Sequence, residues 1–382
     1  MMEHLLNQQV FKIEESLIRK FNSMAIDRGV KWFLTLGEPD FATPEVVKEG
    51  CLKALAANKT KYSVTPGNLD FREKICDFEA KLNGVTYQED EVMVTTGSTE
   101  AITSAILTLL NPDDEVIILT PTYPLYRQIV TFARGKVVTI DTSQNNFQLT
   151  EAMLEGAITN RTKAIILTSP NNPTGSILSD ESLAVVYQAV RKHQFFVLSD
   201  ECYNQIVYEN RTFGISKYQD IRDYLIICQS LSKPYAMTGW RLGYMLASKA
   251  FIEHALKIHQ YMVVCVNTFI QDAGMVALEY DPKAMVNTYR ERRDYMYERL
   301  IEMGMDVTKP EGAFYLFPSI KQYGLSSWEF CSQLAQQEQV AFIPGICFEA
   351  DDFIRISYCV DMETIVEALN RLEVFIHRLQ SK

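Results

Sequence analysis

The chain has 382 residues, of which 47% are hydrophobic and 22% are charged, and its net charge is −11. This is the composition of an ordinary globular protein, and the length is enough for two domains. Because the chain is acidic and has no long basic stretch, nucleic acid and anionic membranes are poor partners for it. A small anionic ligand would need only a local cluster of positive groups.

The eight cysteines are scattered, and no C-x-x-C spacing occurs among them. This pattern argues against a disulfide framework and against a zinc site, so we expect reduced thiols and no metal. Residues 1–21 contain no apolar run long enough for a signal peptide or a membrane span. We therefore expect a cytoplasmic protein.

Residues 1–21 instead have the pattern of an amphipathic helix, with Ile13, Leu17 and Phe21 on one face. Further along, seven short β-rich runs alternate with helical patterns. The alternation predicts an α/β fold with a mostly parallel seven-stranded sheet and helices on both faces. The last run follows a short connection and could be antiparallel. The seven runs are Glu91–Thr95, Glu115–Thr120, Lys136–Ile140, Ala164–Thr168, Phe195–Ser199, Leu225–Cys228 and Leu242–Leu246.

The pattern changes after Pro282, where a long charged helical stretch leads into short strands and a final helix. We interpret residues 1–44 and 283–382 as a smaller α+β domain built from both chain ends. Residues 45–282 then form the large domain that carries the sheet.

Polar residues follow several of the predicted strands, at the edge where open α/β sheets bind ligands. Ser98 and Thr99 open a helix, where backbone N–H groups favour an anion, although a plain N-cap is also common there. Asp200 ends an apolar run, so a buried carboxylate would need a cationic or hydrogen-bond-donating partner, such as a protonated pyridine. The alternative is an N-cap or an aspartate that positions the loop. Lys233 follows another strand and either enters a cleft or is a solvated surface lysine.

Four more residues have both a ligand-binding and a structural interpretation. Asn172, in SPNNPTG, either donates to a ligand oxygen or belongs to a structural turn. Tyr123, in PTYPLY, either stacks on a planar ring or packs in the core. Arg241 directly precedes an apolar strand, and Arg355 lies inside one, FIRIS. Each either binds an anionic ligand or is a surface or salt-bridged residue.

Taken together, these motifs resemble those of the class I and II, fold type I pyridoxal-phosphate aminotransferases. The resemblance runs from LGEPDF at 36–41 to RIS at 355–357, with PTYPLY, SPNNPTG, SDECY and SLSKPYAMTGWRLGY in the same order and spacing. The chain looks most like the bacterial aromatic-acid and N-acetyl-diaminopimelate branch. The resemblance implies amino transfer between an L-amino acid and a 2-oxo acid on bound pyridoxal 5′-phosphate, with ping-pong kinetics.

The resemblance also implies a role for each site residue. Lys233 forms the internal aldimine and moves the proton, while Asp200 pairs with the pyridine nitrogen. Arg355, assisted by the backbone at Gly37, binds the substrate carboxylate. The other cofactor-binding positions are Asn172 and Tyr203 at the ring oxygen, Tyr123 on the ring face, Ser98, Thr99, Ser230 and Arg241 at the phosphate, and Tyr62 from the partner of a homodimer with shared sites.

Two questions stay open at the level of sequence. The loop from Pro344 to Arg355 is short and acidic and lacks the family's later glycine, which puts the substrate's shape in doubt. Residues 259–269 contain no arginine for a second carboxylate, and nearby aromatics suit aromatic or other long side chains. The alternatives are a cysteine-conjugate or cystathionine β-lyase on the same scaffold and, more remotely, a non-catalytic effector-binding module.

Overall fold

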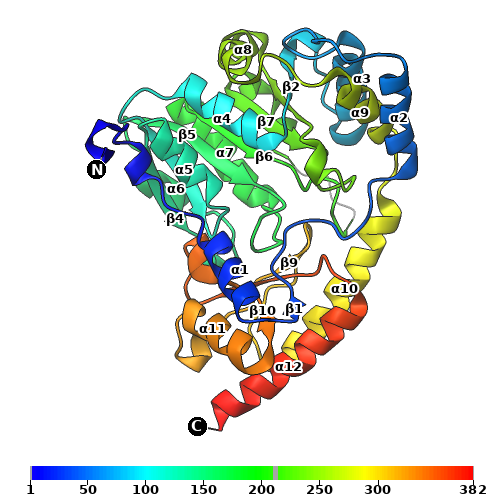
Figure 1. Ribbon diagram of the computed structural model, residues 1–382. Coiled ribbons are helices and arrows are strands. Elements are labelled where there is room, and N and C mark those ends of the chain that lie inside the picture. The colour runs from blue at the N-terminus through cyan, green and yellow to red at the C-terminus, as the bar shows by residue number, and fades with distance from the viewer. Residues whose placement is uncertain (1, 210–213, 382) are drawn as a thin grey trace.

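The computed structural model describes residues 2–209 and 214–381. Its centre is a seven-stranded sheet with the strand order β2-β8-β7-β6-β5-β3-β4 (Figure 1). Each predicted strand is confirmed, with bounds that differ by no more than two residues. The observed strands are β2 (Val92–Thr95), β3 (Glu115–Thr120), β4 (Lys136–Asp141), β5 (Thr162–Thr168), β6 (Phe196–Asp200), β7 (Leu225–Ser230) and β8 (Gly243–Ala247).

The direction of these strands gathers the polar residues at one edge. The β3, β4, β5, β6 and β7 pairings are all parallel, whereas β8 is antiparallel to both of its neighbours, as the short connection suggested. Since β2 and β7 both run opposite to β8, they point the same way. The carboxyl ends of β2, β3, β5, β6 and β7 therefore meet at a single edge of the sheet.

Helices cover both faces of this sheet because alternate strand residues point to opposite sides. In β3, Val116 and Ile118 pack in the layer that contains α4, α5 and α8, whereas Ile117 packs on the other side with α7. Strands that are buried on both faces need continuous apolar runs, which is the pattern that these strands have in the sequence. The α-helices between residues 45 and 282 are α2 (Glu45–Ala56), α3 (Leu69–Asn83), α4 (Ser98–Leu109), α5 (Leu125–Phe132), α6 (Glu151–Ala157), α7 (Asp180–His193), α8 (Lys249–Val263) and α9 (Thr268–Ala277).

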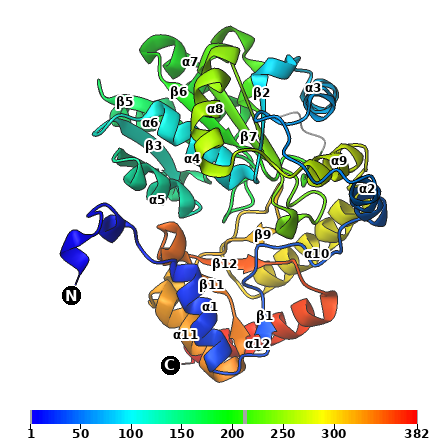
Figure 2. The ribbon, with the colours of Figure 1, turned by 45° about the horizontal axis from the view of Figure 1, so that its top comes forward.

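A separate hydrophobic core joins the two ends of the chain, and in Figure 2 α1 lies beside α11, where the rings of Phe21 and Trp328 are in contact. We propose on this basis that residues 1–44 and 283–382 form one domain and residues 45–282 the other. The elements of the smaller part are α1 (Leu17–Asp27), β1 (Trp32–Phe33), α10 (Lys283–Glu302), β9 (Tyr315–Leu316), α11 (Ser327–Glu338), β10 (Val340–Ala341), β11 (Ile343–Pro344), β12 (Ile354–Ser357) and α12 (Met362–Gln380).

The N-terminal helix begins later than the sequence pattern predicted. Ser16 is its N-cap and accepts a hydrogen bond from the backbone of Arg19, so α1 starts at Leu17. Ile13 lies outside the helix, and residues 2–12 form two short 3-10 turns. The prediction of one helix with Ile13 on its apolar face was therefore wrong, because a capping side chain outweighed the hydrophobic periodicity.

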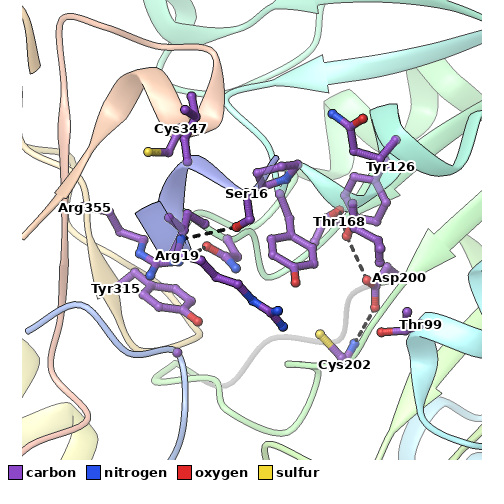
Figure 3. Close-up of a pocket in the computed structure, with 18 of the residues that line it drawn as sticks. Ser16, Arg19, Thr99, Tyr126, Thr168, Asp200, Cys202, Tyr315, Cys347 and Arg355 are labelled. Carbon is purple, nitrogen blue, oxygen red and sulfur yellow. Dashed lines mark hydrogen bonds between the residues drawn. The ribbon is translucent and has the colours of Figure 1, made fainter. Parts of the chain in front are cut away.

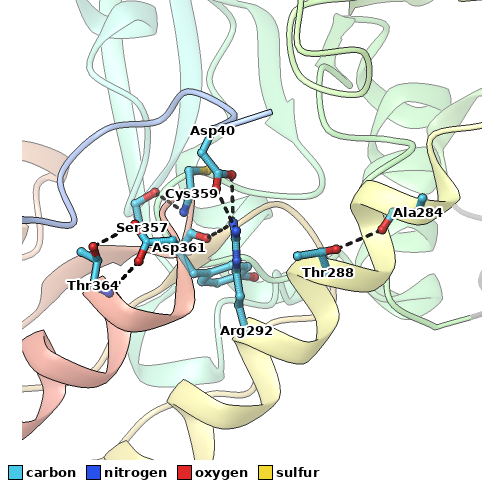
Figure 4. Close-up of polar contacts among 9 residues, drawn as sticks. Asp40, Ala284, Thr288, Arg292, Ser357, Cys359, Asp361 and Thr364 are labelled. Carbon is cyan, nitrogen blue, oxygen red and sulfur yellow. Dashed lines mark hydrogen bonds and ion pairs between the residues drawn. The ribbon is translucent and has the colours of Figure 1, made fainter. Parts of the chain in front are cut away.

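An ion pair ties the N-terminal passage to α10. The guanidinium of Arg292 donates from both terminal nitrogens to Asp40, each at 2.8 Å, and also to the backbone oxygen of Tyr358 at 3.3 Å (Figure 4). A two-pronged contact of this kind holds both partners in one orientation. It fixes the backbone just after Gly37, which lines the cavity described below.

Among the described helices, none combines the length and the apolar character needed to cross a membrane.

Candidate active site

A cavity of about 1110 Å³ opens at the carboxyl edge of the large sheet, where the smaller part of the chain faces it. Residues more than 300 positions apart in sequence line it, from the start of α1 to β12. Tyr62 is the one predicted site residue absent from the described lining. The predicted residues that do line the cavity are Gly37, Ser98, Thr99, Tyr123, Asn172, Asp200, Tyr203, Ser230, Lys233, Arg241 and Arg355.

Asp200, the last residue of β6, is a buried carboxylate with hydrogen-bond donors on one side (Figure 3). The hydroxyl of Tyr126 donates to it at 2.8 Å, and Thr168 in turn donates to the Tyr126 oxygen at 2.8 Å. The backbone N–H of Cys202 donates to the other oxygen at 3.3 Å. Burial raises the pKa of Asp200 and these donors lower it. A cationic ring nitrogen in the cavity would complete its charge balance.

Lys233 follows β7 and is the amine of the cavity. Its Nζ donates to the backbone oxygen of Gly37 at 2.6 Å, and burial lowers the pKa of this lysine. A lysine that is neutral more of the time is a better nucleophile and base. A Cβ added at Gly37 would lie 2.3 Å from the hydroxyl of Tyr315, so a side chain there would have to displace this buried tyrosine. That hydroxyl bonds to the hydroxyl of Tyr203 at 2.8 Å.

The turn between β2 and α4 is suited to bind an anion, and we call this site, formed by Gly97, Ser98, Thr99, Ser230 and Arg241, the phosphate cup. Gly97 has a φ of 82°, and a Cβ there would come within 2.7 Å of the guanidinium of Arg241. The helix opens at Ser98, and the side chains of Ser98, Thr99 and Ser230 line the same cavity as Arg241. A helix N-terminus, three hydroxyls and a guanidinium are suited to a phosphate.

Arg355 in β12 lines the cavity, and hydrogen bonds and aromatic rings hold its guanidinium in one orientation. It donates to the side-chain oxygen of Asn172 at 2.9 Å and to the backbone oxygen of Thr35 at 2.6 Å. The rings of Tyr315 and Phe348 lie 4.6 and 4.8 Å from its guanidinium carbon. Its Nε is buried and has no partner within the described part of the chain. Such a fixed fork is suited to a carboxylate, and the amide hydrogens of Asn172 are left for a second ligand atom.

The acidic loop before Arg355 also borders the cavity, but its carboxylates have partners. Glu349 receives two hydrogen bonds from Arg127, at 2.7 and 2.5 Å. Asp351 accepts from the backbone N–H of Ser327 at 2.9 Å. The loop thus brings less free negative charge to the site than its sequence suggested.

Sequence reasoning missed three contributors to this cavity. Tyr126 belongs to the same PTYPLY motif as Tyr123, and its position three residues further along was the available signal. Tyr315 carried no motif of its own. Arg19, at the start of α1, carried none either, and Figure 3 shows its side chain extending toward the centre of the cavity.

These residues fit a flat, phosphate-bearing cofactor with an aldehyde and a ring nitrogen. The buried carboxylate Asp200 suits the nitrogen, the amine of Lys233 suits the aldehyde, and the cup at the start of α4 suits the phosphate. Tyr123, which is 38% exposed and lines the cavity, offers an aromatic face. The fold and site together define a pyridoxal-phosphate-dependent enzyme.

Comparison with known families narrows this class. The sequence profile of the family "Aminotransferase class I and II" matches residues 31–372. The chain belongs to this family, whose members use pyridoxal 5′-phosphate and exchange amino groups between an amino acid and a 2-oxo acid. The chain is thus a pyridoxal-phosphate-dependent aminotransferase.

Individual relatives cover nearly the whole chain. It is 40% identical to a probable N-acetyl-LL-diaminopimelate aminotransferase of Bacillus subtilis (strain 168), over 98% of this chain and 96% of the relative. It is 35% identical to aromatic-amino-acid aminotransferase 2 of Thermococcus litoralis, over 96% and 97%. The crystal structure of an aspartate aminotransferase from Thermotoga maritima superposes with a TM-score of 0.93 at 34% identity, covering 97% of this chain and 100% of that chain.

Removing the Tyr126 hydroxyl tests the proposed role of Asp200. Without this donor the pKa of Asp200 rises further, so the ionised form is lost at a higher pH. We expect Tyr126→Phe to shift the acid limb of the kcat/KM profile upward in pH and to lower kcat/KM about 10-fold, as for a charged hydrogen bond of about 1.5 kcal/mol.

Tyr187→Phe is the matched control, because its hydroxyl also donates to a carboxylate, that of Asp220 at 2.8 Å, but on the surface. Its pH profile should equal that of the wild type. An unchanged profile for Tyr126→Phe would show that Asp200 does not need this donor.

Proposed function

We propose that the protein transfers an amino group between an L-amino acid with a long or aromatic side chain and a 2-oxo acid such as 2-oxoglutarate, by ping-pong kinetics. The observation that carries the proposal is the shared cavity of Lys233, Asp200 and Arg355. The cavity thus contains an amine for proton transfer, a buried carboxylate for the cofactor's ring nitrogen and a fixed guanidinium for the substrate carboxylate.

Each of these side chains has a distinct task in the proposal. Arg355 binds the substrate α-carboxylate and so orients the α-carbon toward Lys233. The amine of Lys233, whose pKa is lowered by burial, takes the α-proton and returns it as an acid. Asp200 keeps a bound ring nitrogen protonated, and Asn172 and Tyr203 hold the ring oxygen. The cofactor, when bound, supplies an electron sink for the α-carbon.

Lys233→Ala removes both the covalent attachment point and the proton-transfer base. We expect the purified variant to lack the absorbance of lysine-bound cofactor and to lose at least about 10³-fold in kcat, which is within the contribution of general acid–base catalysis. A donor and acceptor screen on the wild type and on the surface control Lys81→Ala provides the reference. Normal turnover by Lys233→Ala would refute the mechanism.

The same screen separates the two other functions considered. Release of pyruvate and a thiol from cystathionine, without any 2-oxo acid, would favour the β-lyase. A cofactor-loaded wild type that transaminates no substrate would favour the effector-binding module.

We further infer that Arg19 selects acceptors with a second carboxylate. Three of the cavity's cations already have tasks, namely Lys233, Arg241 and Arg355, and a fourth, Arg127, is paired with the acidic loop. The guanidinium of Arg19 makes no hydrogen bond or ion pair with any side chain in the described ranges. Its charge also reaches the site: burial raises the pKa of the Tyr123 hydroxyl, and Arg19 is among the cations that oppose this rise. Residues 259–269 contain no arginine that could bind a second carboxylate. In this proposal, Arg19 of α1 takes that role.

Arg19→Gln keeps a flexible polar side chain, two atoms shorter than arginine, and removes its charge. We expect kcat/KM for 2-oxoglutarate to fall about 10- to 100-fold, since a hydrogen bond between charged groups contributes about 1.5–3 kcal/mol. The value for 2-oxopentanoate, which has the same chain length but no second carboxylate, should change less than about twofold. Lys20→Gln, a neighbouring charge that does not line the cavity, is the control. Equal losses with both acceptors would contradict the assignment.

We also propose a homodimer with shared active sites. Tyr62 and Tyr261 are 85% and 90% exposed, and Val64 and Val264 are also exposed. Their segments lie together, because Ser63 donates to the backbone oxygen of Val266 at 3.0 Å and Thr268 donates to that of Lys61 at 2.8 Å. An exposed apolar surface of this kind is suited to a second copy of the chain, which would bring Tyr62 to the partner's phosphate.

Sedimentation should therefore give the mass of two chains. Tyr62→Phe should leave that mass unchanged but weaken pyridoxal 5′-phosphate binding about 10-fold, because it loses one hydrogen bond to a charged group. Tyr280→Phe removes another exposed hydroxyl and should bind like the wild type. A fully active monomer would exclude shared sites.

A cytoplasmic location also belongs to the proposal. It is supported by the cysteines, all eight of which are free thiols, five of them buried. Free thiols in this number suit a reducing compartment.

A further inference from the structure

A hydrogen-bonded histidine and glutamate lie inside the helical layer behind the phosphate cup. His259 of α8 is fully buried, Glu100 of α4 is 5% exposed, and the imidazole Nδ1 lies 2.6 Å from one carboxylate oxygen of Glu100. Figure 2 shows the two helices side by side on one face of the sheet. Burying two ionisable groups in an apolar layer is costly, so the pair requires an explanation beyond packing.

The second oxygen of Glu100 points to the phosphate turn. It accepts from the backbone N–H of Thr96 at 2.6 Å and from the Thr96 hydroxyl at 3.0 Å. Thr96 directly precedes Gly97, and its own backbone oxygen accepts from the guanidinium of Arg241 at 3.4 Å. A chain of contacts thus runs from α8 to both the backbone and the arginine of the cup.

The imidazole has no other task in the described part of the chain. The carboxylate of Glu100 is its single side-chain partner there, and its Nε2 is buried without a hydrogen bond. Neither His259 nor Glu100 lines the cavity in the described structure. Whatever the pair does for a ligand therefore acts through Thr96.

We propose that His259 and Glu100 are positioning residues for the phosphate of the cofactor. The inference rests on the phosphate site of the proposed function and deepens it. His259 holds the carboxylate in the orientation that fixes the Thr96 backbone, and thereby the N–H groups that open α4.

Affinity for two forms of the cofactor separates positioning from simple packing. Pyridoxal has the ring and the aldehyde but no phosphate, so a phosphate-specific role affects pyridoxal 5′-phosphate alone. We expect the dissociation constant of His259→Leu apoenzyme for pyridoxal 5′-phosphate, measured by absorbance titration, to rise about 10- to 100-fold, the range of one lost charged hydrogen bond. Pyridoxal binding should change less than about threefold.

His259→Asn provides the rescue, because its amide nitrogen takes the place of Nδ1 as the donor to Glu100. Its affinity for pyridoxal 5′-phosphate should lie within a few-fold of the wild type. His254→Leu, an exposed histidine on the same helix, is the matched control. If His259→Leu does not fold, the nearly isosteric Glu100→Gln replaces it, with the same expected loss of phosphate-specific affinity.

The outcomes separate this inference from the proposed function. Equal losses for both ligands in His259→Leu, or no loss for either, would overturn the positioning role and leave the phosphate site intact. A wild type that binds pyridoxal as tightly as pyridoxal 5′-phosphate would refute the phosphate site itself, and the positioning role with it. A phosphate-specific loss that Asn restores supports both.

Discussion

The site depends on a carboxylate that the fold buries at the carboxyl end of β6. Asp200 receives hydrogen bonds from Tyr126 and Cys202, yet burial still raises its pKa. A buried acid of this kind is stabilised as a carboxylate by hydrogen-bond donors and further by a nearby positive charge. The protonated nitrogen of the family's cofactor supplies such a charge, so the fold and the cofactor are adapted to one another.

The remaining geometry follows from which elements meet across the cavity. The large sheet supplies the phosphate cup, Asp200 and Lys233 from the ends of parallel strands. The smaller part supplies Arg355, and the N-terminal passage supplies Gly37, which is anchored by the Asp40–Arg292 pair. In the proposed function, substrate binding and cofactor binding are therefore divided between the two chain regions. The role that we propose for Arg19 would place substrate choice on a third element, the start of α1.

A lining of several arginines raises the question of how they avoid binding one anion together. The structure separates them by partner. Arg127 is neutralised by Glu349, and Arg355 is held by Asn172 and Thr35. Arg241 is held against the turn at Gly97. Behind that turn, the pair formed by His259 and Glu100 adds a second layer of support that does not touch the cavity.

The sequence by itself determined the strands, the parallel sheet and the chemistry-bearing motifs, because these depend on local apolar runs and on the residues that directly follow them. It did not determine where α1 begins, since one capping hydroxyl of Ser16 outweighed the helical periodicity. Only the tertiary structure decided that Tyr126 donates to Asp200, that Arg19 enters the cavity, and that His259 meets Glu100. Those contacts join residues that are dozens to hundreds of positions apart, and no local pattern carries the information for such pairings.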